Sequence, residues 1–142
     1  MLEDVVNFNE VPIDDAEFTE KCRLELNQKG VVTLHNFLKY ETVEELIKEA
    51  KTRSRLAYFT DSTHNVYLTP KNENLGPEHV FNRQLNSSKG CITTDQIPEN
   101  SKLKELYFSD IFKNFICRVV EEEALYEYAD SLSSINVHYA SE

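Results

Sequence analysis

The most regular pattern in the chain is a helical repeat of apolar residues between positions 111 and 120. The residues of this repeat are Ile111, Phe112, Phe115, Ile116, Val119 and Val120. In an α-helix they share one face, and such a face needs another element to pack against. Ser109 or Asp110 is suited to begin the helix, because a short polar side chain can accept a hydrogen bond from a free backbone N–H. The pattern therefore predicts an amphipathic helix packed on a folded core.

A second helix is expected over residues 14–28. Phe18, Cys22 and Leu26 recur at every fourth position and would form one apolar stripe. Two acidic residues open the segment, which suits the positive end of a helix dipole. Gly30 follows the segment and provides the left-handed residue that commonly ends a helix.

Two further helical segments are indicated by their first residues. Thr42 is expected to cap a helix, with Glu45 three positions later completing a capping box. The apolar face of this helix would consist of Val43, Leu46, Ile47 and Ala50. Ser101 is expected to begin a short helical turn.

Short strands are expected between these helices. Residues 31–34 are apolar and β-branched, residues 65–69 and 133–140 alternate, and residues 91–94 form another short candidate. Residues 86–90 are expected to form a loop. Helices and short strands together predict an α+β fold, and the length of 142 residues suits a single domain over residues 1–142.

The charge of the chain excludes several classes of partner. It has 15 Lys and Arg against 25 Asp and Glu, a net charge of −10. A protein that follows nucleic-acid phosphates needs a basic face, so nucleic acid is not an expected partner. No run approaches the roughly 18 apolar residues of a membrane span, and the acidic N-terminus does not resemble a secretory signal. No membrane partner is therefore expected.

The cysteines favour a reducing compartment. The chain has three, Cys22, Cys91 and Cys117, and none lies within four residues of another. This spacing does not match a zinc ribbon or a C-x-x-C redox motif. A cytoplasmic location is the prediction, because unpaired cysteines persist where thiols stay reduced.

Three polar residues are candidates for lining a substrate cavity. Asn136 and His138 share one face of the strand predicted at 133–140, and that face could line a cavity or meet solvent. Arg83 lies between apolar residues and could bind a substrate carboxylate or form a structural ion pair. The four histidines show no metal-ligand spacing.

Two segments resemble the non-haem iron, 2-oxoglutarate-dependent oxygenases. Residues 30–38, GVVTLHNFL, followed by TVEEL at 42–46, are similar to the opening strand and helix of that family. Residues 128–139, YADSLSSINVHY, resemble the strand that runs into the family's H-x-D motif. The branch that this chain resembles includes hydroxylases and halogenases of free amino acids.

The resemblance implies a fold and cofactors. The fold would be a helical support layer plus the first strands of a double-stranded β-helix, or jelly roll, left incomplete in this chain. A parent enzyme would use Fe(II) and 2-oxoglutarate to oxidise a small-molecule substrate. The family holds iron with two His and one carboxylate.

The iron ligands of the family are not matched in this sequence. The H-x-D motif would follow the strand that ends at Tyr139, and His138 does not match it because Tyr139 and Ala140 follow. We therefore expect an N-terminal portion of an oxygenase that is inactive and binds no cofactor by itself. Arg83, Asn136 and His138 would be possible cavity-lining residues in the complete enzyme. The alternatives are a non-catalytic acidic interaction or regulatory module, and a small enzyme whose His and carboxylate groups meet only in the folded state.

Overall fold

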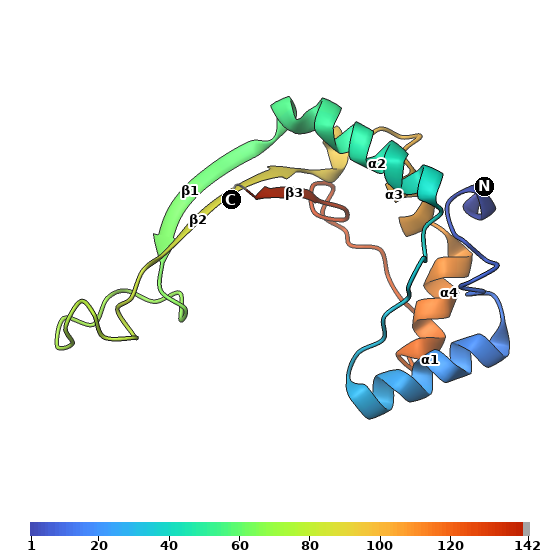
Figure 1. The fold of residues 1–142 in the computed structure, drawn as a ribbon, viewed down its shortest axis with the longest axis horizontal. Coiled ribbons are helices and arrows are strands. Elements are labelled where there is room, and N and C mark those ends of the chain that lie inside the picture. Colours follow the sequence, from blue (N-terminus) through green and yellow to red (C-terminus); the bar gives the residue numbers. More distant parts are fainter. Residues whose placement is uncertain (141–142) are drawn as a thin grey trace.

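The computed structural model describes residues 1–140, which form an α+β structure with a three-stranded antiparallel sheet. The helices are α1 (Ala16–Lys29), α2 (Tyr40–Arg53), α3 (Lys102–Tyr107) and α4 (Asp110–Val119), and the strands are β1 (Tyr58–His64), β2 (Leu85–Ile92) and β3 (Val137–Ala140). Short 3-10 turns lie at Leu2–Asp4, Ser54–Leu56 and Thr94–Gln96. Figure 1 shows an arch, with the helices at one end and the β1–β2 hairpin extending away from them. The predicted α+β class is confirmed.

The core lies where the N-terminal segment, α1 and α4 meet. Its buried residues are Val5, Val6, Val11, Ile13, Cys22, Phe115 and Val119. Phe18 of α1 stacks on Phe115 of α4 with ring centroids 6.2 Å apart. The apolar face predicted over residues 111–120 packs into this core, although Ile111 and Val120 at its ends remain exposed. The strongest pattern in the sequence is thus confirmed.

Three helices begin at the polar residues that favour helix starts. The side chains of Asp15, Ser101 and Ser109 accept hydrogen bonds of 2.7, 3.2 and 3.3 Å from backbone N–H groups two or three residues later. Gly30 ends α1 with a φ of 72°, which glycine adopts without steric cost. These boundaries agree with the sequence analysis.

The predicted start of α2 is wrong. The helix begins at Tyr40, after Lys39, and Thr42 lies inside its first turn. Thr42 is 2% exposed, and its hydroxyl donates a 3.0 Å hydrogen bond to the carbonyl of Asp4. The N-terminal segment packs over this turn and takes up the hydroxyl, so the capping box with Glu45 does not form.

Two predicted strands are also wrong. Residues 31–34 form an unpaired connector, and residues 65–69 form a turn. Val32 and Leu34 still pack against the core. The apolar pattern of residues 31–34 therefore reflects contact with the helices rather than strand pairing. The nearby backbone pairing is a single bridge between Val6 and Leu38.

The sheet itself is built largely from segments that the sequence analysis did not identify as strands. β1 is polar apart from its first two residues, and residues 86–90, expected to be a loop, lie inside β2. Of the strand predicted at 91–94, only Cys91 and Ile92 belong to β2. β3 confirms the last four residues of the strand predicted at 133–140.

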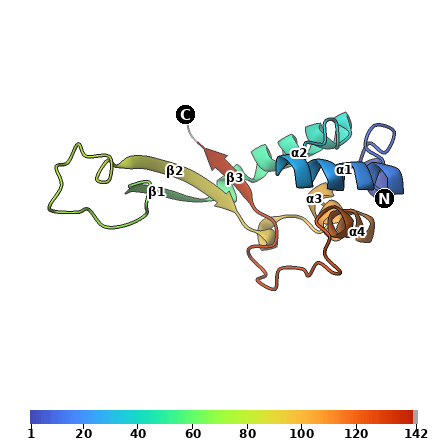
Figure 2. The same ribbon diagram turned by 90° about the horizontal axis from the view of Figure 1, so that it is seen from below.

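The folded chain exposes an unusually large surface. Its solvent-accessible area is 10443 Å², whereas a compact protein of the same mass exposes about 7,500 Å². Figure 2 shows the reason, because the β1–β2 hairpin projects beyond the helices with both faces of its ribbon open. Within residues 1–140, no helix is both long enough and apolar enough to span a bilayer.

Candidate functional site

Arg83 lies in the loop that leads into β2. Its side chain is exposed, and its backbone N–H donates to the carbonyl of His79 at 3.1 Å. The guanidinium is thus presented to solvent near the tip of the hairpin. Among residues 1–140, no helix lies over this part of the ribbon (Figure 1).

Asn136 and His138 lie at the other end of the sheet. The Asn136 side-chain amide donates a 2.9 Å hydrogen bond to the carbonyl of Leu132 and so shapes the turn before β3. His138 is exposed and lies opposite Cys91 of β2. Since β2 rises about 3.3 Å per residue, Arg83 and His138 are separated by most of the strand, and the sheet does not bring them together.

His138 belongs to a row of three reactive side chains across the sheet. The register places Tyr58 of β1, Cys91 of β2 and His138 of β3 side by side. A phenol, a thiol and an imidazole therefore share one face of the sheet. Cys91 is partly exposed and free of a disulfide.

This row does not constitute a metal centre. Within residues 1–140, no three His, Cys, Asp or Glu side chains are close enough together to hold a metal ion. The two-His, one-carboxylate set implied by the family resemblance is therefore not present among these residues. They do not fit iron, and no reaction step can be derived for them through that metal.

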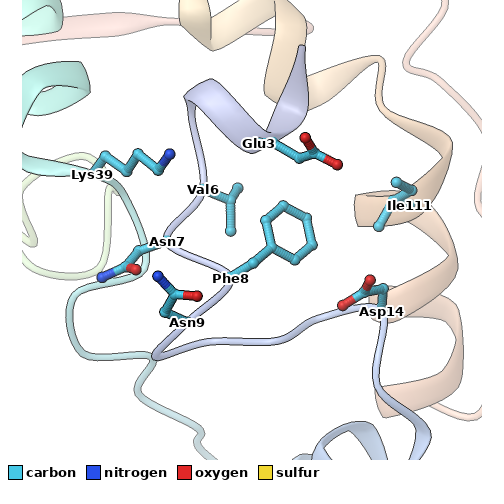
Figure 3. Close-up of a pocket in the computed structure, with 8 residues that line it drawn as sticks. All are labelled: Glu3, Val6, Asn7, Phe8, Asn9, Asp14, Lys39 and Ile111. Carbon is cyan, nitrogen blue, oxygen red and sulfur yellow. The ribbon is translucent and has the colours of Figure 1, made fainter.

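The hollow in Figure 3 lies between the N-terminal segment and the starts of α2 and α4. It measures about 330 Å³ and is lined by Glu3, Val6, Asn7, Phe8, Asn9, Asp14, Lys39 and Ile111. The Phe8 ring lies in its middle, with Glu3, Ile111 and Asp14 around it and Lys39 beyond Val6. Small-molecule sites commonly enclose about 300–1,000 Å³, so this hollow is at the small end. Its carboxylates are exposed, and the sequence-predicted site residues do not line it.

A cluster of charges beside this hollow attaches the N-terminal segment to α3. The Met1 ammonium lies 2.8 Å from a carboxylate oxygen of Asp4 and 2.7 Å from one of Glu105. Lys102 forms a further 3.1 Å ion pair with Glu105. Hydrogen bonding to the Met1 ammonium lowers the pKa of Asp4 and Glu105, and Lys102 adds to the effect on Glu105. Each charge of the cluster lies beside one of opposite sign, and the cluster joins the N-terminal segment to α3.

The tip of the β1–β2 hairpin is an ordered loop built around a buried asparagine. Asn65 is 1% exposed. Its side-chain amide donates 3.0 Å hydrogen bonds to the carbonyls of Thr69 and Phe81, and its oxygen accepts from the N–H groups of Tyr67 and Thr69 at 3.1 and 3.0 Å. One side chain thus joins the two sides of the loop.

A second buried asparagine holds the rest of this loop. Asn82 is 4% exposed, accepts from the N–H of Asn72 at 2.8 Å and donates to its carbonyl at 2.9 Å. Neither asparagine is predicted to be structural from its position in the sequence. The frequency of Asn in residues 65–82 could have indicated this role, because Asn side chains replace backbone hydrogen-bond partners in turns.

Comparison with known proteins identifies no relative. No family model matches the chain, and no curated protein and no solved structure matches it.

Proposed function

We propose that this chain is the N-terminal portion of an Fe(II)- and 2-oxoglutarate-dependent oxygenase acting on a small molecule, and that it is inactive by itself. The observation that carries the proposal is the open three-stranded sheet, which accompanies the four helices and has two free edges within residues 1–140. The sequence resemblance at residues 30–46 and 128–139 is a second observation in favour of the proposal.

The exposure of the sheet supports this proposal. Tyr58 is 74% exposed on one face and Phe59 is 61% exposed on the other. Uncovered aromatic side chains and free strand edges favour association with further strands. A double-stranded β-helix would provide that cover, because its strands form two sheets packed face to face.

The contribution of this chain to such an enzyme would be structural. In the complete enzyme, iron and 2-oxoglutarate would supply oxygen activation, and their ligands would come from outside residues 1–140. The packed pair α1 and α4, which lies at the other end of the arch from the hairpin, would form part of the helical body of the complete fold. Arg83, Asn136 and His138 would be available to line the substrate cavity once further strands close it.

The test is the intact mass of the native protein that contains this sequence, followed by an assay of 2-oxoglutarate turnover with and without Fe(II). A mass well above 16.5 kDa together with iron-dependent turnover supports the proposal. A native mass of 16.5 kDa, or a longer protein without turnover, contradicts it.

The second candidate is a non-catalytic acidic interaction module. The ordered hairpin tip favours it, because Val66, Leu68 and Val80 are 63%, 76% and 69% exposed on a loop held by two buried asparagines. A module of this kind unfolds in one cooperative transition as the isolated chain. A fragment of a larger fold aggregates or binds hydrophobic dyes instead, so an unfolding curve with a dye control separates the two candidates.

A further inference from the structure

The N-terminal segment, which lines the hollow of Figure 3, is the most one-sided in charge. Residues 1–20 contain seven Asp and Glu and no Lys or Arg, whereas the whole chain has 15 Lys and Arg against 25 Asp and Glu. The positive Met1 ammonium in this segment already lies between Asp4 and Glu105. A surface with one sign of charge raises the local concentration of ions of the opposite sign. The hollow is therefore expected to attract cations.

Two carboxylates that line the hollow are available to such a cation. Asp4 has the Met1 ammonium as a partner at 2.8 Å, and Asp15 accepts a 2.7 Å hydrogen bond from the Phe18 N–H. Their sequence neighbours Glu3 and Asp14 differ, because within residues 1–140 neither of these side chains forms a hydrogen bond or an ion pair. Both are exposed and both line the hollow, so a ligand can reach them.

An apolar surface lies between these two carboxylates. Ile111 belongs to the apolar repeat of α4 but is 43% exposed, and it lines the hollow together with the half-buried Phe8. Figure 3 shows the Phe8 ring with the Glu3 carboxylate above it and the Asp14 carboxylate below it in the view. An aromatic ring attracts a cation, and both side chains gain free energy when a hydrocarbon group covers them. The preferred ligand therefore combines a positive charge with an apolar body.

The positive side chain of the lining lies apart from this arrangement. Lys39 is beyond Val6 from the Phe8 ring in Figure 3. Within residues 1–140, its ammonium group forms no ion pair. Because like charges repel, a bound cation would lie on the side of Glu3 and Asp14 rather than beside Lys39. Lys39 thus limits the position of the ligand.

We propose that this hollow binds a small organic cation, a primary ammonium ion with a short branched hydrocarbon body. The ammonium group would lie beside the carboxylates of Glu3 and Asp14, and the body would cover Phe8 and Ile111. The volume of about 330 Å³ suits a ligand of this size. None of the three residues predicted from the sequence to line a substrate cavity lines this hollow. The inference therefore goes beyond the proposed function and does not rest on it.

The probe is 3-methylbutylammonium, titrated into the full 142-residue chain and followed in the ¹⁵N–¹H spectrum. It is expected to shift the backbone signals of Phe8, Asn9 and Ile111. One control, 3-methylbutan-1-ol, keeps the hydrocarbon body and lacks the charge, and the other, the ammonium ion, keeps the charge and lacks the body. Each control is expected to bind at least about threefold more weakly, because each loses one of the two contributions. Low ionic strength is required, because salt screens exposed charges.

A matched pair of variants locates the site. Glu3→Gln removes a carboxylate of the hollow, and Glu73→Gln makes the same change at the hairpin tip, away from the helices (Figure 1). Glu3→Gln is expected to weaken binding by about two- to fivefold, and Glu73→Gln to leave it unchanged. Asp14→Asn should act like Glu3→Gln, whereas Lys39→Gln should strengthen binding. Far-UV circular dichroism and the thermal midpoint of each variant establish that the fold is kept.

Three results overturn the inference. The first is a set of shifts that map away from the hollow, and the second is binding of either control as tight as that of the probe. The third is equal weakening by Glu3→Gln and Glu73→Gln, which would show attraction to the net charge alone. The experiment contains no iron and no 2-oxoglutarate, so its failure leaves the oxygenase proposal to be judged by native mass and turnover. Failure of the oxygenase proposal likewise leaves the cation site to be judged by this titration.

Discussion

The Tyr139 hydroxyl donates a 2.6 Å hydrogen bond to the backbone carbonyl of Ala50 and so joins β3 to the last turns of α2. Burial raises the pKa of this phenol, which keeps it in the protonated, donating form. The bond connects the sheet to the helices across a large sequence separation. It therefore contributes to the placement of the whole hairpin.

The first prediction concerns this bond. Tyr139→Phe should lower the free energy of unfolding by about 1 kcal/mol, because the ring packing stays while one hydrogen bond is lost. Urea denaturation measures the change. Tyr126→Phe is the matched control, since Tyr126 is 91% exposed, and its effect should be close to zero. Equal effects of the two substitutions would contradict a structural role for the Tyr139 hydroxyl.

The second prediction concerns Gly90, which the Phe59 ring covers. A Cβ atom at position 90 would lie 2.7 Å from that ring, closer than carbon atoms pack. Gly90→Ala should displace the exposed Phe59 ring from its rotamer and destabilise the chain by about 0.5–1.5 kcal/mol. Adding Phe59→Ala should remove most of that cost, because the clash disappears. Denaturation of both single variants and the double variant measures the coupling, and strictly additive effects would show that the ring does not lie over Gly90.

These two contacts explain which parts of the fold could be predicted from sequence. Helix boundaries at Asp15, Gly30, Ser101 and Ser109 depend on hydrogen bonds within a few residues, so local patterns predict them. β1 depends on pairing with β2 and on a glycine far along the chain that leaves room for Phe59. No local alternation marks such a strand, because its inward and outward residues are both largely polar.

The same distinction applies to the candidate site. The sequence places Asn136 and His138 on one strand segment, and β3 does present His138 on its exposed face. Whether residues from separate strands converge depends on the register in which the strands pair and on the elements that pack over the sheet. Arg83 and His138 lie near opposite ends of β2. The spacing of these residues in the sequence does not predict that separation.

The third prediction is a pH dependence at the turn before β3. Asp130 accepts hydrogen bonds from the N–H of Leu132 at 2.9 Å and the hydroxyl of Ser133 at 2.8 Å, and these bonds lower its pKa. A carboxylate with a lowered pKa stabilises the fold above the unfolded-state pKa of about 3.9, and this stabilisation is lost as the pH falls through the folded-state pKa. The turn should therefore remain formed at pH 5 and open in more acidic solution.

A carboxyl-carbon NMR titration of Asp130 checks this prediction. Its midpoint should lie below about 3.9 in the wild-type chain. Ser133→Ala should raise the midpoint only in part, because the Leu132 N–H remains as the stronger partner. A wild-type midpoint at or above the ordinary value would contradict the hydrogen-bonded turn.

The fourth prediction concerns order at the hairpin tip. Asn65→Ala removes the hydrogen bonds that join the two sides of the loop, those to the Thr69 and Phe81 carbonyls and that from the Thr69 N–H. Amide exchange at Tyr67 and Thr69 should accelerate by about tenfold or more, while exchange in α1 and α4 stays unchanged. Asn74→Ala is the control, because Asn74 is exposed at the same tip. Equal acceleration in both variants would mean that Asn65 does not hold the loop.

The last prediction tests whether the helical body carries most of the stability. Phe115 is 3% exposed and stacks on Phe18, so Phe115→Ala should cost about 3–5 kcal/mol through lost burial and a residual cavity. Phe108→Ala is the control, because Phe108 is 45% exposed beyond α3, and its cost should be much smaller. If the chain is one cooperative unit, Phe115→Ala also lowers the denaturation midpoint reported by β3 amide signals. If the β3 signals keep their midpoint while the helices unfold, the sheet derives its order from its own strand pairing rather than from the helical core.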